Sequence, residues 1–350
     1  MSTALSANAV DGRPIENGRV HDSKFAVRKL LGLMLCLAFP AALNPQEVVF
    51  PTPIRVETVL VNVPAIVTDS RGMHIPGLKK EDFRLYEDGS PQPISIFAAS
   101  EEPVNVALLL DTSKSTVTVL ERIKKAARGF LGSMRPRDRA LLISFDLDVK
   151  VLYPLSDDVK DLDETVKGVK PGDYVGTKLR DAVLEVTANR FKSITGRKAI
   201  ILLSDGQDFG SRASVADLLA SVAESGVLVY SVFYKVDIRA LSRELFGVPI
   251  PGQLQDSIWQ QREREAAAFL QELSELSAGR FMPSEISNLH KTFAQIIEEL
   301  RHQYLLGFYP EMAKLDGSPH TLNVVVEREG AVVRARHDYR VLRQNEGKGF

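Results

Sequence analysis

Hydrophobic and polar residues alternate at both ends of the chain, which has 350 residues. Between residues 54 and 97 the alternation is typical of strands with one buried face. Asp88 and Gly89 separate two strand-like stretches there, which favours a hairpin turn. Residues 321–341 contain two further strand-like stretches around an Arg-Glu-Gly sequence. We expect these two β-rich regions to pair with each other in one accessory sheet.

The middle of the chain, from about residue 103 to 305, has a different pattern. Short continuous apolar runs predict strands covered on both faces, at 106–110, 140–145, 198–204 and 227–234. Residues 149–155 extend the second of these strands as a hairpin. Amphipathic stretches between the runs predict helices at 119–134, 179–191, 215–226 and 289–306. Residues 266–281 predict a further helix that runs into a short strand. Residues 245–256 are rich in Pro and Gly and predict a loop.

Alternating strands and helices predict an α/β fold with a doubly wound, mostly parallel sheet. A small accessory β unit, built from both flanks, accompanies it. The predicted organisation is a signal peptide at 1–43, an N-terminal β segment at 44–102, the α/β domain at 103–305, a C-terminal β segment at 306–342 and a tail at 343–350.

An apolar run near the N-terminus favours export of the protein. Arg28 and Lys29 precede residues 30–43, which only Gly32 and Pro40 interrupt. The run is too short for a membrane span, which needs ~20 residues, and has the features of a secretory signal. A buried helix is the alternative. No later segment is long and apolar enough to span a bilayer, so we expect an exported chain without a membrane span.

Composition and charge exclude several classes of function. The 44 basic and 45 acidic residues leave a formal net charge of -1, which gives no general attraction for nucleic acid. Cys36 is the single cysteine, so an intramolecular disulfide is excluded. It also lies inside the predicted signal.

Three connections between predicted strands and helices carry hydroxyl or carboxylate side chains. All three can lie at one edge of the sheet. Ligands bind at the carboxyl ends of the strands in such folds. The residues are Asp111, Ser113, Ser115, Thr177 and Asp205. An all-oxygen set suits Mg²⁺, or Mn²⁺, better than zinc or copper. Mg²⁺ keeps open coordination positions, which a carboxylate from another molecule can fill.

The sequences Asp-Thr-Ser-Lys-Ser at 111–115, Gly-Thr at 176–177 and Ser-Asp-Gly at 204–206 resemble the metal-ion-dependent adhesion site of von Willebrand factor type A domains. The resemblance covers about residues 103–305. The flanks also resemble an exported branch of this family known from acidobacteria. The resemblance implies that Asp111, Ser113 and Ser115 contact Mg²⁺ directly or through water. It implies that Thr177 and Asp205 complete the site. Lys114 stands where the family often has a small residue and could change the choice of partner.

Each piece of this motif has a simpler explanation when taken alone. Asp111 or Ser113 could cap a helix, with Ser115 or Thr116 capping the helix that follows. Asp205-Gly206 could be a plain turn, and Gly176-Thr177 could be a helix start. These explanations do not account for the three loops together. Three further carboxylates lie near the same edge by sequence and are expected to be solvated, namely Asp146, Asp148 and Asp208.

The expected function is binding of a protein partner that presents an acidic residue to the metal, in adhesion or assembly. A metal-assisted hydrolase on the same fold is an alternative, but Ser113 stands where a phosphotransfer enzyme needs an acid–base carboxylate. The chain has no G-x-G-x-x-G after a strand, no G-x-S-x-G and no H-E-x-x-H sequence. A scaffold with a vestigial metal site is the other alternative.

Overall fold

The computed structural model describes residues 59–99, 102–172, 176–237, 241–243, 247, 253–311 and 317–340. The predicted signal peptide, Cys36 and the tail at 343–350 lie outside the described residues. Among the helices of the described part of the chain, none combines the length and hydrophobicity needed to cross a membrane.

A six-stranded sheet forms the centre of the α/β domain, with the strand order β10-β9-β8-β5-β6-β7. All neighbouring strands run parallel except β6 and β7, which form an antiparallel pair. In chain order the strands are β5 Val104–Asp111, β6 Arg139–Phe145, β7 Val149–Ser156, β8 Arg197–Ser204, β9 Leu228–Phe233 and β10 Arg280–Pro283. Every residue of β5, β8 and β9 is buried, as continuous apolar runs predict for strands covered on both faces. The predicted doubly wound α/β fold is therefore confirmed.

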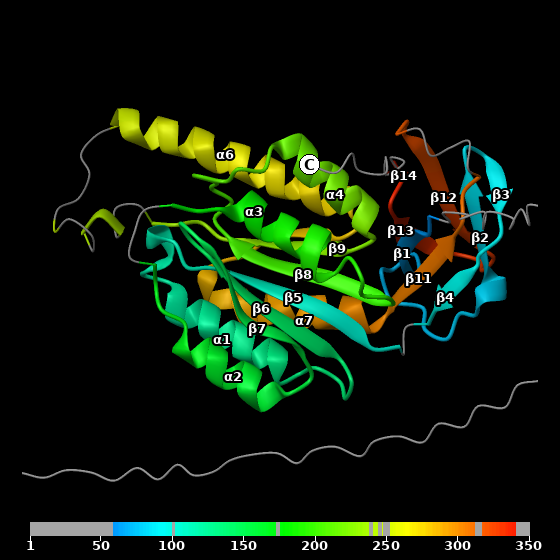
Figure 1. Ribbon diagram of the computed structural model, residues 1–350, viewed down its shortest axis with the longest axis horizontal. Helices are drawn as coiled ribbons and strands as arrows, with labels where there is room; N and C mark the ends of the chain where they lie inside the picture. Colours follow the sequence, from blue (N-terminus) through cyan, green and yellow to red (C-terminus); the bar gives the residue numbers. More distant parts are fainter. Residues whose placement is uncertain are drawn as a thin grey trace, which may run out of the picture. The chain divides into compact units, whose positions relative to one another are not determined.

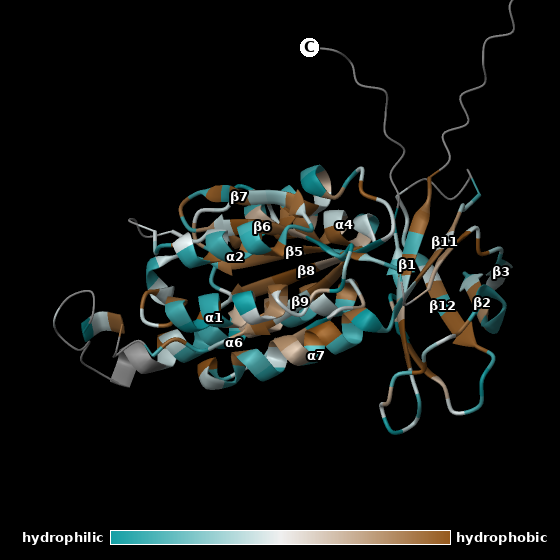
Figure 2. Ribbon diagram, turned by 90° about the horizontal axis from the view of Figure 1, so that it is seen from below, coloured by the Kyte–Doolittle hydropathy of each residue, from teal (hydrophilic) through white to brown (hydrophobic). Residues whose placement is uncertain are grey.

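Helices cover both faces of this sheet (Figure 1). They are α1 Leu120–Leu131, α2 Val159–Gly168, α3 Leu179–Leu184 with the π-helical turn Glu185–Arg190, α4 Val215–Ser225, α6 Gln253–Leu276 and α7 Leu289–Arg301. Short 3₁₀ turns span Lys80–Asp82, Lys114–Thr116 and Ile286–Asn288. Figure 2 shows hydrophobic central strands beneath helices that carry hydrophilic residues. The alternation of apolar and polar positions along the helices thus matches a sheet that lies between two helical layers.

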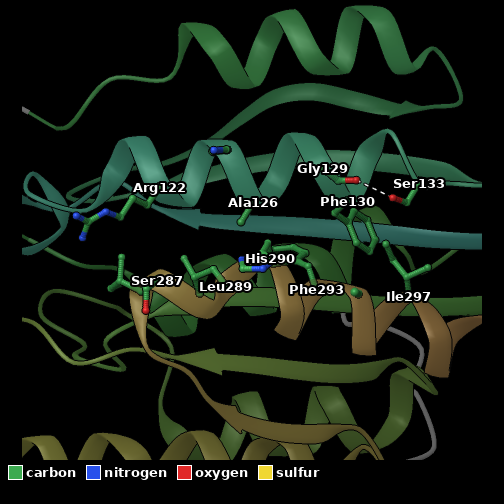
Figure 3. A pocket seen from close by; sticks show the side chains of 13 residues that line it. Arg122, Ala126, Gly129, Phe130, Ser133, Ser287, Leu289, His290, Phe293 and Ile297 are labelled. Carbon is green, nitrogen blue, oxygen red and sulfur yellow. Dashed lines mark hydrogen bonds between the residues drawn. The ribbon is translucent and has the colours of Figure 1, made fainter.

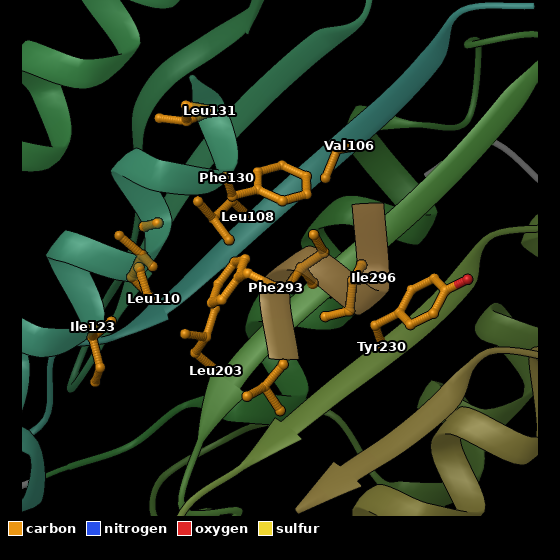
Figure 4. Packing of buried hydrophobic residues seen from close by; sticks show 14 of the residues in the cluster. Val106, Leu108, Leu110, Ile123, Phe130, Leu131, Leu203, Tyr230, Phe293 and Ile296 are labelled. Atoms are coloured by element: carbon orange, nitrogen blue, oxygen red, sulfur yellow. The ribbon is translucent and has the colours of Figure 1, made fainter. Parts of the chain in front are cut away.

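Each face of the sheet has its own hydrophobic core. On one face, Leu108 and Leu110 of β5 and Leu203 of β8 pack with Phe130 of α1 and Phe293 of α7 (Figure 4). The two rings meet edge to face, with centroids 5.6 Å apart. The second core joins the other face of the same strands to α3, α4 and α6. Together these cores fix the positions of the strand ends.

The flanks form two four-stranded sheets, in the orders β13-β1-β11-β4 and β14-β12-β2-β3. The strands are β1 Val61–Thr68, β2 Phe83–Glu87, β3 Ser90–Gln92, β4 Ile96–Ala98, β11 Gln303–Phe308, β12 His320–Val326, β13 Val332–Ala335 and β14 Asp338–Tyr339. One hydrophobic core contains residues of both sheets, so they pack face to face. Pairing between the two chain ends is as predicted, but the expected single accessory sheet was wrong.

Two predicted element boundaries were also wrong. The helix expected at 289–306 ends at Arg301, and the following residues form β11, which lies between β1 and β4. Pairing with these two strands overrides a local sequence that is compatible with a helix. In the predicted loop at 245–256, residues 253–256 belong to α6, which begins 13 residues before the predicted start at 266 (266 minus 253).

Close contacts join the accessory β sandwich to the α/β domain. Glu299 of α7 is buried and accepts hydrogen bonds from Arg280 of β10 and Arg334 of β13. At another contact, Gly226 ends α4 in the left-handed conformation with φ of 63°. A Cβ atom at this position would lie 2.5 Å from the Cβ of Asn62 in β1. Gly226 therefore serves both as the helix end and as the point of close approach.

We predict that Gly226→Ala destabilises the chain by about 2–4 kcal/mol, because a left-handed alanine costs about 1 kcal/mol and overpacking adds about 1–3 kcal/mol. Gly196→Ala is the matched control, since Gly196 has φ of 82° but open space around it. Urea denaturation should show a loss of about 1 kcal/mol in the control. Equal losses in both variants would contradict the close approach.

Candidate functional site

Asp111 is the last residue of β5, and its side chain is fully buried. Its Oδ1 accepts hydrogen bonds from the Ser113 amide at 3.0 Å and the Ser113 hydroxyl at 2.5 Å. Its Oδ2 accepts one from the Ser204 hydroxyl at the end of β8, at 2.7 Å. Both carboxylate oxygens are thus held in place by groups from the ends of two neighbouring strands.

The loop after Asp111 turns its hydroxyl groups toward one another. The Ser113 and Ser115 Oγ atoms are 3.0 Å apart, and the Thr116 hydroxyl donates to the Ser113 carbonyl at 2.8 Å. Helix α1 begins after Val119, with no side-chain hydrogen bond capping it. The simpler explanation of Ser115 or Thr116 as a helix cap is therefore wrong.

Asp205 follows the end of β8 and is 5% exposed. Its Oδ1 accepts the Gln207 amide at 3.1 Å. Its Oδ2 is buried and has no hydrogen-bond donor in the described part of the chain. A buried carboxylate oxygen without a partner is unfavourable, so this atom indicates a place where a cation or water would be stabilising.

Thr177 is placed by main-chain pairing with the loop that follows β8. Its amide donates to the Phe209 carbonyl at 2.9 Å, and the Phe209 amide donates back at 2.8 Å. The residue is buried and lies two positions before Leu179, the first residue of the short helix α3. The structure therefore ties the second predicted loop directly to the third.

These loops surround a cavity of about 810 Å³. Ser113, Ser115, Thr177 and Asp205 line it. Asp111 does not line the cavity, but its carboxylate accepts a hydrogen bond from Ser113, which does. The structure thus brings all five predicted residues to the edge of the sheet at the carboxyl ends of β5 and β8.

The electrostatics of the site are dominated by two buried carboxylates. Burial, and then the charge of Asp205, raise the pKa of Asp111 to about 7, although hydrogen bonds from Ser113 and Ser204 act in the opposite sense. Burial also raises the pKa of Asp205, while the Gln207 amide, which donates to its carboxylate, and the nearby Ser115 hydroxyl lower it in part. Two acidic groups in this environment favour either protonation or a bound cation.

The donor set fits a hard divalent cation. Carboxylate oxygens from Asp111 and Asp205 and hydroxyl oxygens from Ser113, Ser115 and Thr177 are the ligand types that such ions prefer. Asp205 Oδ2, with no donor among the described residues, is available for this purpose. The residues present therefore fit a metal, with Asp111 and Asp205 supplying the charge.

Two residues at the site were not predicted as part of it. Ser204 positions Asp111 through its hydroxyl, and the only sequence signal was its place in the Ser-Asp-Gly motif. Tyr234 is fully buried, and its hydroxyl has no partner within the described residues. Its pKa lies well above the usual value, because of burial and then the charges of Asp111 and Asp205. No pattern in the sequence indicated this tyrosine.

Two of the three carboxylates expected to be solvated are not. Asp146 is 6% exposed and accepts hydrogen bonds from the Thr112 hydroxyl at 3.1 Å and the Asp148 amide at 3.0 Å. Asp208 is half-buried and pairs with Arg180 at 3.2 Å. Only Asp148 is exposed as predicted. Asp146 and Asp208 therefore stabilise the loops of the site.

Another cavity, of about 600 Å³, lies between α1 and α7 (Figure 3). Its lining includes Arg122, Phe130, His290 and Phe293, and it shares no residue with the predicted site. It therefore does not compete with the loop cavity as the location of the predicted metal chemistry.

One family model matches part of the chain. Residues 106–207 match the sequence model of the von Willebrand factor type A domain, and this range contains all five predicted site residues. No curated protein matches the chain.

Several solved structures are similar at low identity. BatB from Bacteroides thetaiotaomicron is 20% identical, with 56% of this chain and 98% of that chain covered and a TM-score of 0.43. A mussel byssus protein, proximal thread matrix protein 1 with a zinc-occupied MIDAS motif, is 14% identical, with 57% and 48% covered and a TM-score of 0.44. A von Willebrand factor type A protein from Catenulispora acidiphila is 11% identical, with 82% and 75% covered and a TM-score of 0.44. These likenesses are too distant to indicate a function.

The buried carboxylate at Asp111 predicts a specific pH dependence of stability. Because its pKa is raised in the folded chain, the metal-free protein loses stability as the pH rises from about 4 through about 7. Asp111→Asn keeps the hydrogen-bonding shape without the charge. The difference in unfolding temperature between Asp111→Asn and the unsubstituted chain should therefore grow in favour of the variant as the pH rises over this range.

Asp148→Asn is the control, since Asp148 is exposed and near the same loops. The unfolding temperature of Asp148→Asn should not rise in the same way relative to that of the unsubstituted chain. Thermal unfolding in chelator measures both variants, and a pH-independent difference for Asp111→Asn would contradict the interpretation.

Proposed function

Because residues 106–207 of this chain are a von Willebrand factor type A domain, we propose that the protein is an exported, Mg²⁺-dependent module that binds a protein partner. The proposal rests chiefly on one observation. Two buried carboxylates, Asp111 and Asp205, lie next to hydroxyl groups under an open cavity, and Asp205 Oδ2 has no donor among the described residues. A bound cation would remove the cost of this arrangement.

The chain's own residues have distinct parts in this function. Asp111 would hold the metal from below, with Ser113 and Ser204 fixing the orientation of its carboxylate. Asp205 would supply a second negative charge. Ser115 and Thr177 would contribute oxygens at the wall of the cavity. When bound, Mg²⁺ offers a coordination position that an acidic side chain of a partner can fill.

The geometry gives less support to a hydrolase. The described lining of the cavity contains no histidine. Ser113, which occupies the position of a catalytic acid in phosphotransfer enzymes, already donates to Asp111. Asp208 is paired with Arg180 and is thus engaged in loop structure. Adhesion or assembly therefore remains the function we propose, with export based on the sequence at 1–43.

We predict that the full chain binds Mg²⁺ and that Asp111→Asn or Asp205→Asn weakens this binding by at least about 100-fold. Each substitution removes one of the two charges that would hold the cation. Isothermal titration calorimetry at about pH 8 measures the affinity, since protonation competes with the metal at lower pH. Asp148→Asn should bind as the unsubstituted chain does. Heat of binding unchanged in both site variants would overturn the metal assignment.

Partner binding is tested by capture from extracts of the native host on the immobilised chain. A partner should be retained in Mg²⁺ and released by chelator, because its acidic residue needs the cation. Asp111→Asn should retain none. Equal retention in Mg²⁺ and chelator would contradict a metal-bridged contact.

A further inference from the structure

One side of the cavity is formed by α6, whose early start was not predicted. Trp259, Arg262, Ala266 and Phe269 line the cavity and recur at the helical spacing of three and four residues. They therefore lie on one face of the helix. Trp259 and Phe269 are both only partly buried, and Phe269 also packs against the second hydrophobic core. Each therefore has a part of its ring exposed to a ligand.

The loop after β8 supplies a second apolar surface. Phe209 is 69% exposed and Val215 is 40% exposed, and both line the same cavity. The main chain of Phe209 is fixed by its two hydrogen bonds to Thr177. Exposed aromatic side chains on a fixed main chain are typical of protein-binding surfaces.

The position of α6 next to the proposed metal site depends on a close approach. Gly206 has φ of 75°, and a Cβ atom there would lie 3.0 Å from both the Ala266 Cβ and the Leu270 Cδ1. An ion pair of 2.5 Å between Lys235 and Glu263 also connects α6 to the chain after β9. The aromatic face of α6 and Asp205 thus belong to one continuous, ordered surface.

Basic and acidic side chains both line the cavity. The basic ones are Lys114, Arg180 and Arg262, and the acidic ones are Asp205, Asp208 and Glu265. Arg180 pairs with Asp208, whereas neither Lys114 nor Arg262 forms an ion pair with another described residue. A ligand with a second acidic group would gain electrostatic complementarity at these two residues.

We propose that this surface selects a partner segment in which the acidic residue is accompanied by an aromatic or branched apolar side chain, with a second acidic residue nearby. This inference rests on the proposed metal-dependent function. The first carboxylate would reach the metal, and the apolar side chain would pack against Trp259, Phe209 and Phe269. The second acidic residue would pair with Arg262 or Lys114.

Selection of displayed random peptides on the immobilised full chain tests this inference. Peptides enriched in Mg²⁺ but not in chelator should contain Asp or Glu with an aromatic or branched apolar neighbour. For such a peptide, Trp259→Ala should weaken binding about tenfold, as expected for loss of a central aromatic contact. Selection on the variant should retain the acidic residue and lose the apolar preference.

Ile258→Ala is the matched control, because Ile258 neighbours Trp259 on α6 and is 57% exposed but does not line the cavity. It should select the same peptides as the unsubstituted chain. Mg²⁺ titration should be unchanged in both α6 variants, which separates partner selection from metal binding.

The possible results distinguish the two proposals. Enrichment of acidic residues without an apolar neighbour, or an unchanged apolar preference in Trp259→Ala, would overturn the proposed partner chemistry and leave the metal-dependent function intact. Absence of any Mg²⁺-dependent enrichment on the unsubstituted chain would count against the metal-dependent function itself, and the partner chemistry would fail with it.

Discussion

Burial of two carboxylates at one edge of a parallel sheet is the constraint on which the site depends. Asp111 and Asp205 end or follow strands whose residues are all buried, and their side chains are themselves almost completely buried. Bulk water can therefore offset their charges only to a small extent. Hydrogen bonds from Ser113, Ser204 and Gln207 do so in part. The remaining cost is what a bound cation would remove.

The rest of the fold holds this pair of carboxylates in place. The two hydrophobic cores fix β5 and β8 as neighbours, and the pairing of Thr177 with Phe209 joins the second loop to the third. Buried Asp146 and half-buried Asp208 stabilise the surrounding loops, which explains why neither is solvated. These contacts fix the loops of the site without using the side chains of the proposed metal ligands.

Much of the central sheet could be predicted because its signal is local. A strand covered on both faces needs a continuous apolar run, and β5, β8 and β9 each have one. The strand β11 could not be predicted in this way, since only pairing with β1 and β4 decides between helix and strand for Gln303–Phe308. The early start of α6 was also hidden, because residues 253–265 are mostly polar and follow Pro and Gly.

The candidate site could likewise be predicted only in part. Five residues were identified from a motif spread over three loops, and the structure brings them to one edge of the sheet. Tyr234, Trp259 and Arg262 carry no such motif, and only the three-dimensional arrangement places them near Asp205.

A crystal structure of the full chain grown with Mn²⁺ tests the central claim most directly. An anomalous peak is expected among Asp111, Ser113, Ser115 and Asp205, and a well-ordered site without one would contradict the account.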